Sequence, residues 1–438
     1  MPGIVVVGIQ WGDEGKGKMV DFISEEADFL VRHQGGNNAG HTVWIKGEKY
    51  VLHLLPMGVL RGKTCAIGSG VVVDPGVLLK EIDNLNEKGI SISPENLLLS
   101  PNSHIIFPYH ILIDQLREKR RGKSAIGTTS RGIGPAYRDK IDRCGIRMGD
   151  LVDENRFRPR LETQMEYIND LLVDFFKDAP IPVDEIYEPY VEYGKRLKPF
   201  LSDVPKALHD ANAQGKKILF EGAQGVLLDV DAGTFPFVTS SNTLTGGACT
   251  GTGFPPQSIS GCLGIVKAYT TRVGSGPFPT EVDEETADRL RNAGPAGEFG
   301  ATTGRPRRCG WFDGPLVKRA VMVSGANALA VTRLDVLSEF DEIPIAVRYK
   351  LRGEEIDTAP EDLTLLSECE VVHETMPGWR VDLSGMRTWD ELPENAKAYL
   401  KKIEEITEST VVVASVGPNR DETIVRPDNL YDAIARRQ

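Results

Sequence analysis

The chain alternates short apolar segments, rich in β-branched residues, with segments of helical periodicity. The apolar segments are candidates for buried strands and occupy residues 4–8, 29–33, 70–73, 97–100, 217–222, 263–269, 328–335 and 411–417. Apolar residues recur at helical spacing between several of them, as at 75–89, 108–122 and 392–408. A strand, a helix and a second strand in succession usually form parallel neighbours with the helix over one sheet face. We therefore predict an α/β fold whose mostly parallel central sheet is flanked by helices.

The sequence shows no clear boundary between domains. Its 438 residues exceed the length at which one hydrophobic core usually stops growing, yet no Pro/Gly-rich linker divides it. Residues 150–212 differ from the rest because they are rich in charge and have helical spacing without a convincing strand. We expect a single enlarged α/β domain over residues 1–438, with a helical insertion or subdomain at 150–212 and long functional loops.

Composition argues against several classes of function. The net charge of −12 argues against nucleic acid or an anionic membrane as a partner, because such binding depends on Lys and Arg neutralising phosphates. The six cysteines show neither a disulfide pattern nor the ligand spacing of a structural zinc site. No segment approaches the roughly 18 apolar residues of a membrane span, and no leader sequence is evident. We expect a cytoplasmic protein.

The first candidate strand leads directly into a glycine-rich loop, "GDEGKGK" at residues 12–18. Backbone N–H groups of such a turn, with the next helix N-terminus and a lysine, form a site for phosphate. The loop fits the phosphate-loop pattern except at Met19, where the usual hydroxyl ligand of magnesium is missing. Asp13 is the nearest oxygen ligand that could replace it, and the adjacent Glu14 should point away from Asp13. The alternative, an ordinary strand-to-helix turn, does not account for so many glycines.

Several other loops combine glycine with hydroxyl, amide or basic side chains. The loop "QGGNNAGHT" at 34–42 contains His41, for which a structural and a catalytic role are both open. Five more such loops occupy residues 127–137, 221–225, 238–243, 271–281 and 300–308. Arginine binds phosphate or carboxylate through two hydrogen bonds, and glycine and serine leave backbone N–H groups accessible. Together these loops predict a polar, phosphorylated ligand.

The segment "TRLD" at 332–335 follows a candidate strand and resembles the [NT]-K-x-D segment with which GTP-binding proteins recognise guanine. The carboxylate of Asp335 would accept hydrogen bonds from N1–H and the 2-amino group of guanine, a pattern that adenine does not offer. A match of four residues is frequent by chance, so an ordinary turn is the alternative at this position.

Taken in order along nearly the whole chain, these segments resemble the adenylosuccinate synthetase family. The segments that carry the resemblance are "GDEGKGK", "NNAGHT", "GTTSRGIGPAY", "EGAQG", "VTSSNT", "TRVGSGPFPTE", "GATTGRPRRCGW", "TRLD" and "SVGPNR". The resemblance implies a ligase of purine biosynthesis that joins L-aspartate to IMP at the expense of GTP, through 6-phosphoryl-IMP. It also implies Mg²⁺ as the cofactor and a homodimer.

The resemblance implies roles for three residues at the reaction centre. Asp13 would be the general base that removes the N1 proton of IMP, so that O6 attacks the γ-phosphate of GTP. His41 would be the acid near the bridging phosphate oxygens. Asp13 and the backbone oxygen of Gly40 would bind magnesium, which removes the need for a hydroxyl at position 19. The amino group of aspartate would then displace phosphate, and positioning with charge neutralisation would carry most of the catalysis.

The resemblance also implies the residues of three substrate sites. The IMP site would comprise Asp13, Glu14, Gly15, Lys16, Asn38, Ala39, Gly40, His41, Thr129, Gln224, Thr239 and Arg305, with Arg143 from the neighbouring subunit. The aspartate site would comprise Ala301, Thr302, Thr303, Gly304, Arg305 and Arg307. The GTP site would comprise Gly12, Asp13, Glu14, Gly15, Lys16, Gly17, Lys18, Gly40, His41, Thr42, Arg307, Arg333, Leu334, Asp335, Ser415, Val416 and Gly417.

One residue departs from the family pattern, and two alternative functions remain. The family usually has lysine at position 333, where its stem packs against the base; the guanidinium plane of Arg333 could stack there instead. A GTP-binding switch or assembly protein would use the phosphate and guanine loops but not residues 127–143 or 300–308. An ATP-dependent ligase is disfavoured by Asp335.

Overall fold

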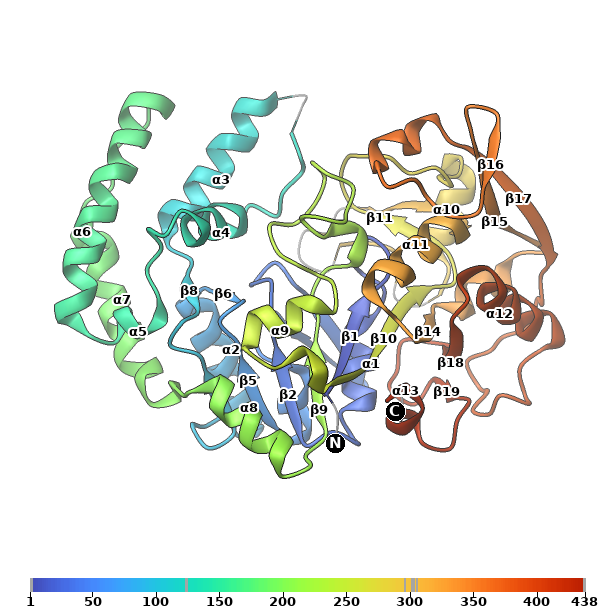
Figure 1. Cartoon of the computed structure of the whole chain (residues 1–438), viewed down its shortest axis with the longest axis horizontal. Coiled ribbons are helices and arrows are strands. Elements are labelled where there is room, and N and C mark those ends of the chain that lie inside the picture. The colour runs from blue at the N-terminus through green and yellow to red at the C-terminus, as the bar shows by residue number, and fades with distance from the viewer. Residues whose placement is uncertain (1–2, 123–124, 295–296, 301–303, 305, 436–438) are drawn as a thin grey trace.

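A computed structural model describes residues 3–122, 125–294, 297–300, 304 and 306–435. A nine-stranded sheet runs through its centre in the order β19-β18-β14-β10-β1-β9-β2-β5-β7 (Figure 1). Every neighbouring pair is parallel except β18 and β19, which are antiparallel. The predicted α/β fold with a mostly parallel sheet is confirmed. The strands of this sheet are β1 (Gly3–Gly8), β2 (Phe29–Arg32), β5 (Thr64–Ile67), β7 (Leu97–Leu99), β9 (Ile218–Glu221), β10 (Ile259–Lys267), β14 (Ala328–Thr332), β18 (Thr410–Ser415) and β19 (Thr423–Val425).

One strand prediction is wrong in its placement. Residues 70–73 contribute only β6 (Val72–Val73), which pairs with β8 (His104–Ile105) outside the central sheet. The sheet position beside β2 and β7 is taken by β5, a segment "TCAI" whose apolar run is too short to stand out in the sequence. The predicted run at 328–335 also ends early, because a 3₁₀ helix begins at Leu334.

Helices cover the sheet, and Figure 1 shows α3–α7 gathered at one side of it and α10–α12 at the other. The helices are α1 (Lys16–Ile23), α2 (Pro75–Glu87), α3 (Pro108–Arg121), α4 (Ile133–Ile141), α5 (Met148–Leu151), α6 (Glu154–Asp170), α7 (Val183–Leu197), α8 (Val204–Ala213), α9 (Gly246–Thr252), α10 (Glu284–Asn292), α11 (Gly314–Ser324), α12 (Glu394–Thr407) and α13 (Leu430–Ile434). The three predicted helical segments correspond to α2, α3 and α12. Residues 150–212 fold largely into helices, and their status as an insertion in a single domain stays a prediction.

Both faces of the central sheet are buried. Val5 and Val7 of β1 belong to one hydrophobic cluster, and Ile4 and Val6 belong to the other. Successive side chains of a strand point to opposite faces, so β1 lies between two cores. Because both faces are buried, the sequence of β1 is apolar throughout and does not alternate between apolar and polar residues.

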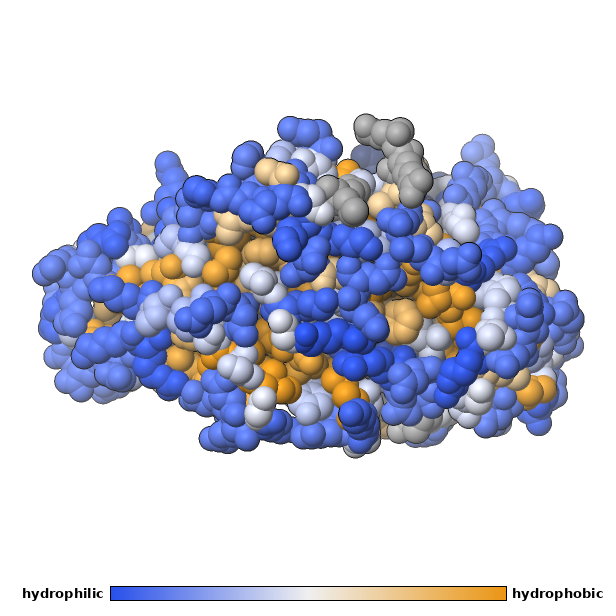
Figure 2. Space-filling model, turned by 90° about the horizontal axis from the view of Figure 1, so that it is seen from below, coloured by the Kyte–Doolittle hydropathy of each residue, from blue (hydrophilic) through white to orange (hydrophobic). Residues whose placement is uncertain are grey.

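Smaller sheets lie around the central one. They contain β3 (His41–Ile45) with β4 (Glu48–Leu52), β11 (Thr270–Arg272) with β12 (Arg308–Gly310), and β15 (Glu342–Leu351) with β13 (Phe312–Asp313), β16 (Glu354–Ile356) and β17 (Glu370–Pro377). Figure 2 shows one face of the molecule, with hydrophilic residues around its periphery and hydrophobic residues visible in its middle. Among the described residues, no helix has the length and apolar character that a membrane crossing requires.

Candidate active site

The carboxyl ends of the parallel strands meet at one edge of the sheet, which is where such sheets bind ligands. Loops that follow β1, β2, β9, β10, β14 and β18 leave a cavity of about 740 Å³ there. The predicted site residues that line it are Gly12, Asp13, Gly15, Lys16, Gly17, Lys18, Asn38, Ala39, Gly40, His41, Thr42, Thr129, Gln224, Thr239, Arg307, Arg333, Ser415 and Gly417. The structure thus brings loops from six strand ends to one cavity.

Other predicted residues do not line this cavity or lie outside the description. Glu14, Leu334 and Val416 are buried, Asp335 is half-buried, Gly304 is exposed, and Arg143 is exposed just after the end of α4. Ala301, Thr302, Thr303 and Arg305 lie outside the described residues, and their roles stay predictions.

The phosphate loop turns sharply, so that its two adjacent acids point in opposite directions. Gly12, Asp13 and Gly15 all have positive φ angles, of 86°, 60° and 87°, a region that glycine adopts without strain. Glu14 is buried beneath the loop, where Oε1 accepts from the backbone N–H groups of Gln10 and Gly12 at 3.0 and 2.8 Å. Asp13 faces the cavity instead. Glu14 therefore holds the loop in shape, and Asp13 is left for ligands.

The two lysines of the phosphate loop have different partners. Lys16 Nζ lies 2.6 Å from Glu14 Oε2. Lys18 Nζ donates to Ser415 Oγ, Gly417 O and Glu422 O at 2.7, 2.7 and 2.8 Å. Its burial lowers the pKa of Lys18 to about 7, although nearby acids raise it. The side chain of Lys18 thus holds the loop after β18 against α1, rather than reaching freely into the cavity.

His41 is held by the carboxylate of Glu221, which was not predicted from the sequence. Its Nδ1 is hydrogen-bonded to Oε1 of Glu221, the last residue of β9, and its Nε2 is buried without a partner among the described residues. Glu221 Oε2 also accepts from Met57 N at 2.8 Å. Burial lowers the pKa of His41, and the Glu221 carboxylate opposes that shift. Since an ionised carboxylate only accepts hydrogen bonds, Nδ1 carries a proton and Nε2 faces the site.

The loop that contains Thr129 is fixed from below by two acids of α3. Glu118 accepts from the backbone N–H groups of Ile126, Gly127 and Thr128. Asp114 accepts from the Thr128 hydroxyl at 3.0 Å and from Gly132 N at 3.1 Å. These carboxylates shape a loop whose own side chains remain available to a ligand.

The segment at residues 332–335, which resembles a guanine-recognition segment, places the carboxylate of Asp335 beside the cavity. Both oxygens of Asp335 are buried and have no hydrogen-bond partner among the described residues. Burial raises the pKa of Asp335, and the charge of Arg333 opposes this. A buried acceptor without a donor is costly, so Asp335 fits a ligand that brings N–H groups.

The side chain of Arg333 does not extend freely over the place where a base would meet Asp335. Its Nε donates to the Tyr269 hydroxyl at 3.3 Å and its guanidinium also reaches Ala293 O at 3.4 Å. The residue has a φ of 61° and lies directly after β14. Arg333, where the family usually has lysine, therefore links residues 332–335 to Tyr269, close to β10, and to Ala293, at the end of α10.

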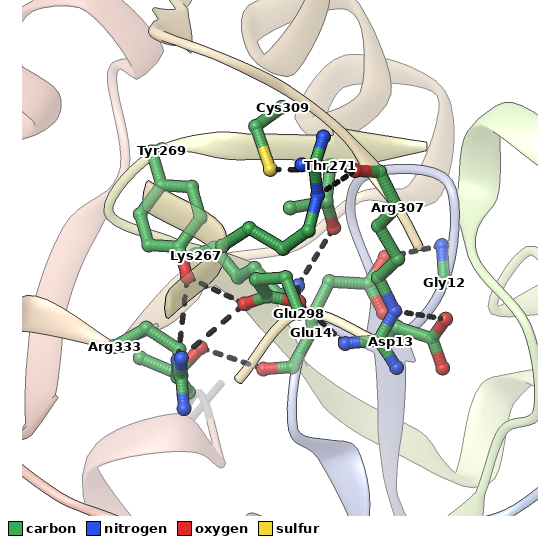
Figure 3. Close-up of polar contacts among 12 residues, drawn as sticks. Gly12, Asp13, Glu14, Lys267, Tyr269, Thr271, Glu298, Arg307, Cys309 and Arg333 are labelled. Carbon is green, nitrogen blue, oxygen red and sulfur yellow. Dashed lines mark hydrogen bonds and ion pairs between the residues drawn. The ribbon is translucent and has the colours of Figure 1, made fainter. Parts of the chain in front are cut away.

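Asp13 is paired with an arginine of the loop before β12. Arg307 Nε lies 3.0 Å from Asp13 Oδ2 (Figure 3). Figure 3 also shows Lys267, Tyr269 and Glu298 next to this pair. These three residues and Glu221 were not predicted from the sequence. Lys267 and Glu221 carried a usable signal, because each is a charged residue at the end of an otherwise apolar strand.

The comparison with protein families distinguishes between the ligase and the GTP-binding switch that the sequence left as alternatives. A family model described as "Adenylosuccinate synthetase" matches residues 5–424. This chain belongs to the adenylosuccinate synthetase family. It is therefore a GTP-dependent ligase of purine biosynthesis that forms a carbon–nitrogen bond between IMP and L-aspartate. Nothing in the comparisons supports a binding-only GTP switch.

Individual relatives agree with the family model. The chain is 51% identical to an adenylosuccinate synthetase of Desulfatibacillum aliphaticivorans over 98% of this chain and 99% of the relative. It is 52% identical to one of Trichlorobacter lovleyi, over 97% of this chain and 98% of the relative. Among solved structures, fully ligated adenylosuccinate synthetase from Plasmodium falciparum matches with a TM-score of 0.91 and 38% identity, covering 97% of this chain and 99% of that one.

Proposed function

We propose that this cavity is where the chain joins L-aspartate to IMP, with Asp13 as the general base. The observation that supports the assignment is that the Asp13 carboxylate faces the cavity while Glu14 is buried beneath the loop. In the first step, Asp13 accepts the N1 proton of IMP as O6 attacks the γ-phosphorus of GTP, which forms 6-phosphoryl-IMP and releases GDP. In the second step, the amino group of aspartate attacks C6 and phosphate leaves, which gives adenylosuccinate.

His41 would act from Nε2 on the phosphate being transferred. Glu221 orients the ring by binding Nδ1, so that Nε2 is the nitrogen directed at a ligand. Burial favours the neutral imidazole, but a phosphate in the cavity would add negative charge and favour the imidazolium. The charged ring would then donate a proton to a bridging phosphate oxygen.

The residues present fit the expected magnesium ion. The Asp13 carboxylate and Gly40 both border the cavity, and the side chain of Asp13 is 36% exposed, so an oxygen ligand is accessible there. Asp13 and the backbone oxygen of Gly40 would hold the ion, with phosphate oxygens and water as the other ligands that magnesium prefers. When bound, the ion would neutralise charge on the phosphates of GTP.

The experiment that tests the proposed function omits one component at a time. With purified protein, GDP should form only when GTP, IMP, aspartate and magnesium are all present, and adenylosuccinate should appear in equal amount. GDP formation that continues without IMP or aspartate would contradict the ligase at this site and would favour a GTPase. Stimulation of GDP formation by another protein instead of by the two substrates would favour the switch.

We also propose that the site is completed by Arg143 of a second copy of the chain. Arg143 does not line the cavity of its own chain, and Ile141, two residues before it, is 77% exposed. Arginine is enriched at interfaces between protein subunits, and a partner that covered Arg143 would also bury the exposed side chain of Ile141. A shared site of this kind requires a symmetric dimer.

Mixing two inactive variants tests the shared site. Arg143→Leu and Asp13→Ala should each be inactive alone but regain partial activity together, because some mixed dimers contain one site with both groups intact. The measurement is adenylosuccinate formation after subunit exchange, and exchange is verified separately with differently tagged chains. If exchange occurs and activity stays absent, the two residues do not serve one shared site.

A further inference from the structure

Glu298 is a buried carboxylate that contacts residues of two proposed substrate sites. Its side chain is 1% exposed, and Figure 3 shows it among Lys267, Tyr269, Arg307 and Arg333. Oε2 lies 2.8 Å from Lys267 Nζ and accepts a hydrogen bond from the Arg307 guanidinium. Oε1 accepts from the Tyr269 hydroxyl at 2.5 Å and lies 3.4 Å from Arg333 Nε. One carboxylate therefore joins the arginine expected at aspartate to the arginine expected at guanine.

The charges in this cluster depend on Glu298 being ionised. Three cationic side chains, Lys267, Arg307 and Arg333, surround it. Burial alone would raise the pKa of Glu298, but these cations hold it far below its usual range. Buried cations without a counter-charge are strongly disfavoured. Loss of the Glu298 charge would therefore drive the two guanidinium groups apart and towards water.

The backbone of Glu298 forms hydrogen bonds of its own, so the role of the side chain can be tested separately. Its N–H donates to Arg291 O at 2.8 Å, and its carbonyl accepts from Arg307 N at 3.0 Å. These bonds close the base of the loop that leads to β12. They remain when the side chain is changed to glutamine, which has nearly the same size and no charge.

We propose that Glu298 is a positioning residue that holds Arg307 for the carboxylates of aspartate and Arg333 for the guanine end of GTP. The inference rests on the proposed function, because it assigns these two arginines to those substrates. Glu298 itself touches no substrate in this account. Loss of its charge should weaken the binding of aspartate and GTP but not the binding of IMP.

The first test compares Glu298→Gln with a matched control, Glu281→Gln. Glu281 also pairs with an arginine next to this loop, since Nε of Arg308, the first residue of β12, donates to it at 2.6 Å, but the Glu281 side chain is 38% exposed. Glu298→Gln should raise the KM for aspartate and the KM for GTP at least about tenfold each. The KM for IMP should change less than about threefold, and Glu281→Gln should leave all three nearly unchanged, as expected for an exposed pair.

A second substitution separates positioning from general damage. In an Arg333→Ala background, Glu298→Gln should raise the KM for aspartate as before but should raise the KM for GTP clearly less than in the wild-type background. One of the two arginines through which it acts on GTP, Arg333, is then gone, while Arg307 remains. Equal increases for all three substrates would show a merely structural role and would overturn the proposal. So would a Glu298→Gln enzyme whose KM values match those of Glu281→Gln.

Tyr269→Phe provides a test should Glu298→Gln fail to fold. It keeps the carboxylate and removes the hydroxyl that bonds both Glu298 and Arg333. The KM for GTP should rise while the KM for aspartate stays within about twofold, and the reverse pattern would contradict the proposal. A wild-type protein that makes no adenylosuccinate would contradict the proposed function, whereas an active wild type with unaffected variants would contradict only this inference.

Discussion

Replacing Asp13 with asparagine is expected to reduce kcat by roughly 10²–10⁴-fold while leaving the affinity for IMP largely intact. The amide has the size of the carboxylate but neither its proton affinity nor its negative charge. It therefore cannot accept the N1 proton of IMP, and it is a weaker partner for magnesium and for Arg307, whose Nε lies 3.0 Å away. The measurements are kcat at saturating substrates and magnesium, and IMP binding by calorimetry.

A second aspartate provides the matched control for Asp13→Asn. Asp83 also pairs with an arginine, with its Oδ1 2.6 Å from Arg196, but both side chains are exposed and lie outside the cavity. Asp83→Asn should retain the wild-type kcat. Near-normal turnover of Asp13→Asn would show that another group is the base.

Asp335→Asn is expected to shift nucleotide preference from GTP towards XTP. Xanthine has an oxygen acceptor where guanine has its 2-amino donor. An asparagine can accept from N1–H and donate to that oxygen, whereas the carboxylate can only repel it. Both oxygens of Asp335 are buried and without a partner among the described residues, so each mismatch should cost about 1–3 kcal/mol. The ratio of kcat/KM for GTP to kcat/KM for XTP should fall by about one or more powers of ten.

The ratio of kcat/KM for GTP to kcat/KM for XTP is the quantity to measure. This ratio is more informative than either affinity alone, because Arg333 replaces the usual lysine and affects the binding of both nucleotides. Asp341→Asn is the control, since that carboxylate is 82% exposed and a few residues farther along the chain. An unchanged ratio in Asp335→Asn would mean that this carboxylate does not recognise the base.

The central sheet was predictable because strands buried on both faces leave a continuous apolar signal. β1 and β18 carry that signal in full, whereas β5 ("TCAI") is short and contains threonine and cysteine. Its place in the sheet depends on pairing with β2 and β7, which are distant in sequence. The antiparallel unit around β15 was not predicted either, because its strands are partly exposed and lack long apolar runs.

Loops that line the cavity could be predicted where a short segment combines glycine with hydroxyl, amide or charged side chains. The phosphate loop and the His41 loop are of that kind, whereas the four residues around Asp335 are distinctive only together with the other segments. Glu221 and Glu298 were missed because their importance depends on partners far along the chain, His41 in one case and Lys267 with two arginines in the other. Local sequence shows a buried acid at such positions but does not show what the acid binds.

In the proposed mechanism, O6 of IMP is phosphorylated before the amino group of aspartate attacks C6, and Asp13 takes the N1 proton. The most direct test supplies IMP labelled with heavy oxygen at O6 and analyses the released phosphate by mass spectrometry, in the wild type and in Asp13→Asn. We expect the label to appear in phosphate at the rate of turnover in the wild type and to appear more slowly in Asp13→Asn, by the same factor as kcat. Unlabelled phosphate, with the label in water, would mean that aspartate displaces O6 directly and would contradict the proposed mechanism.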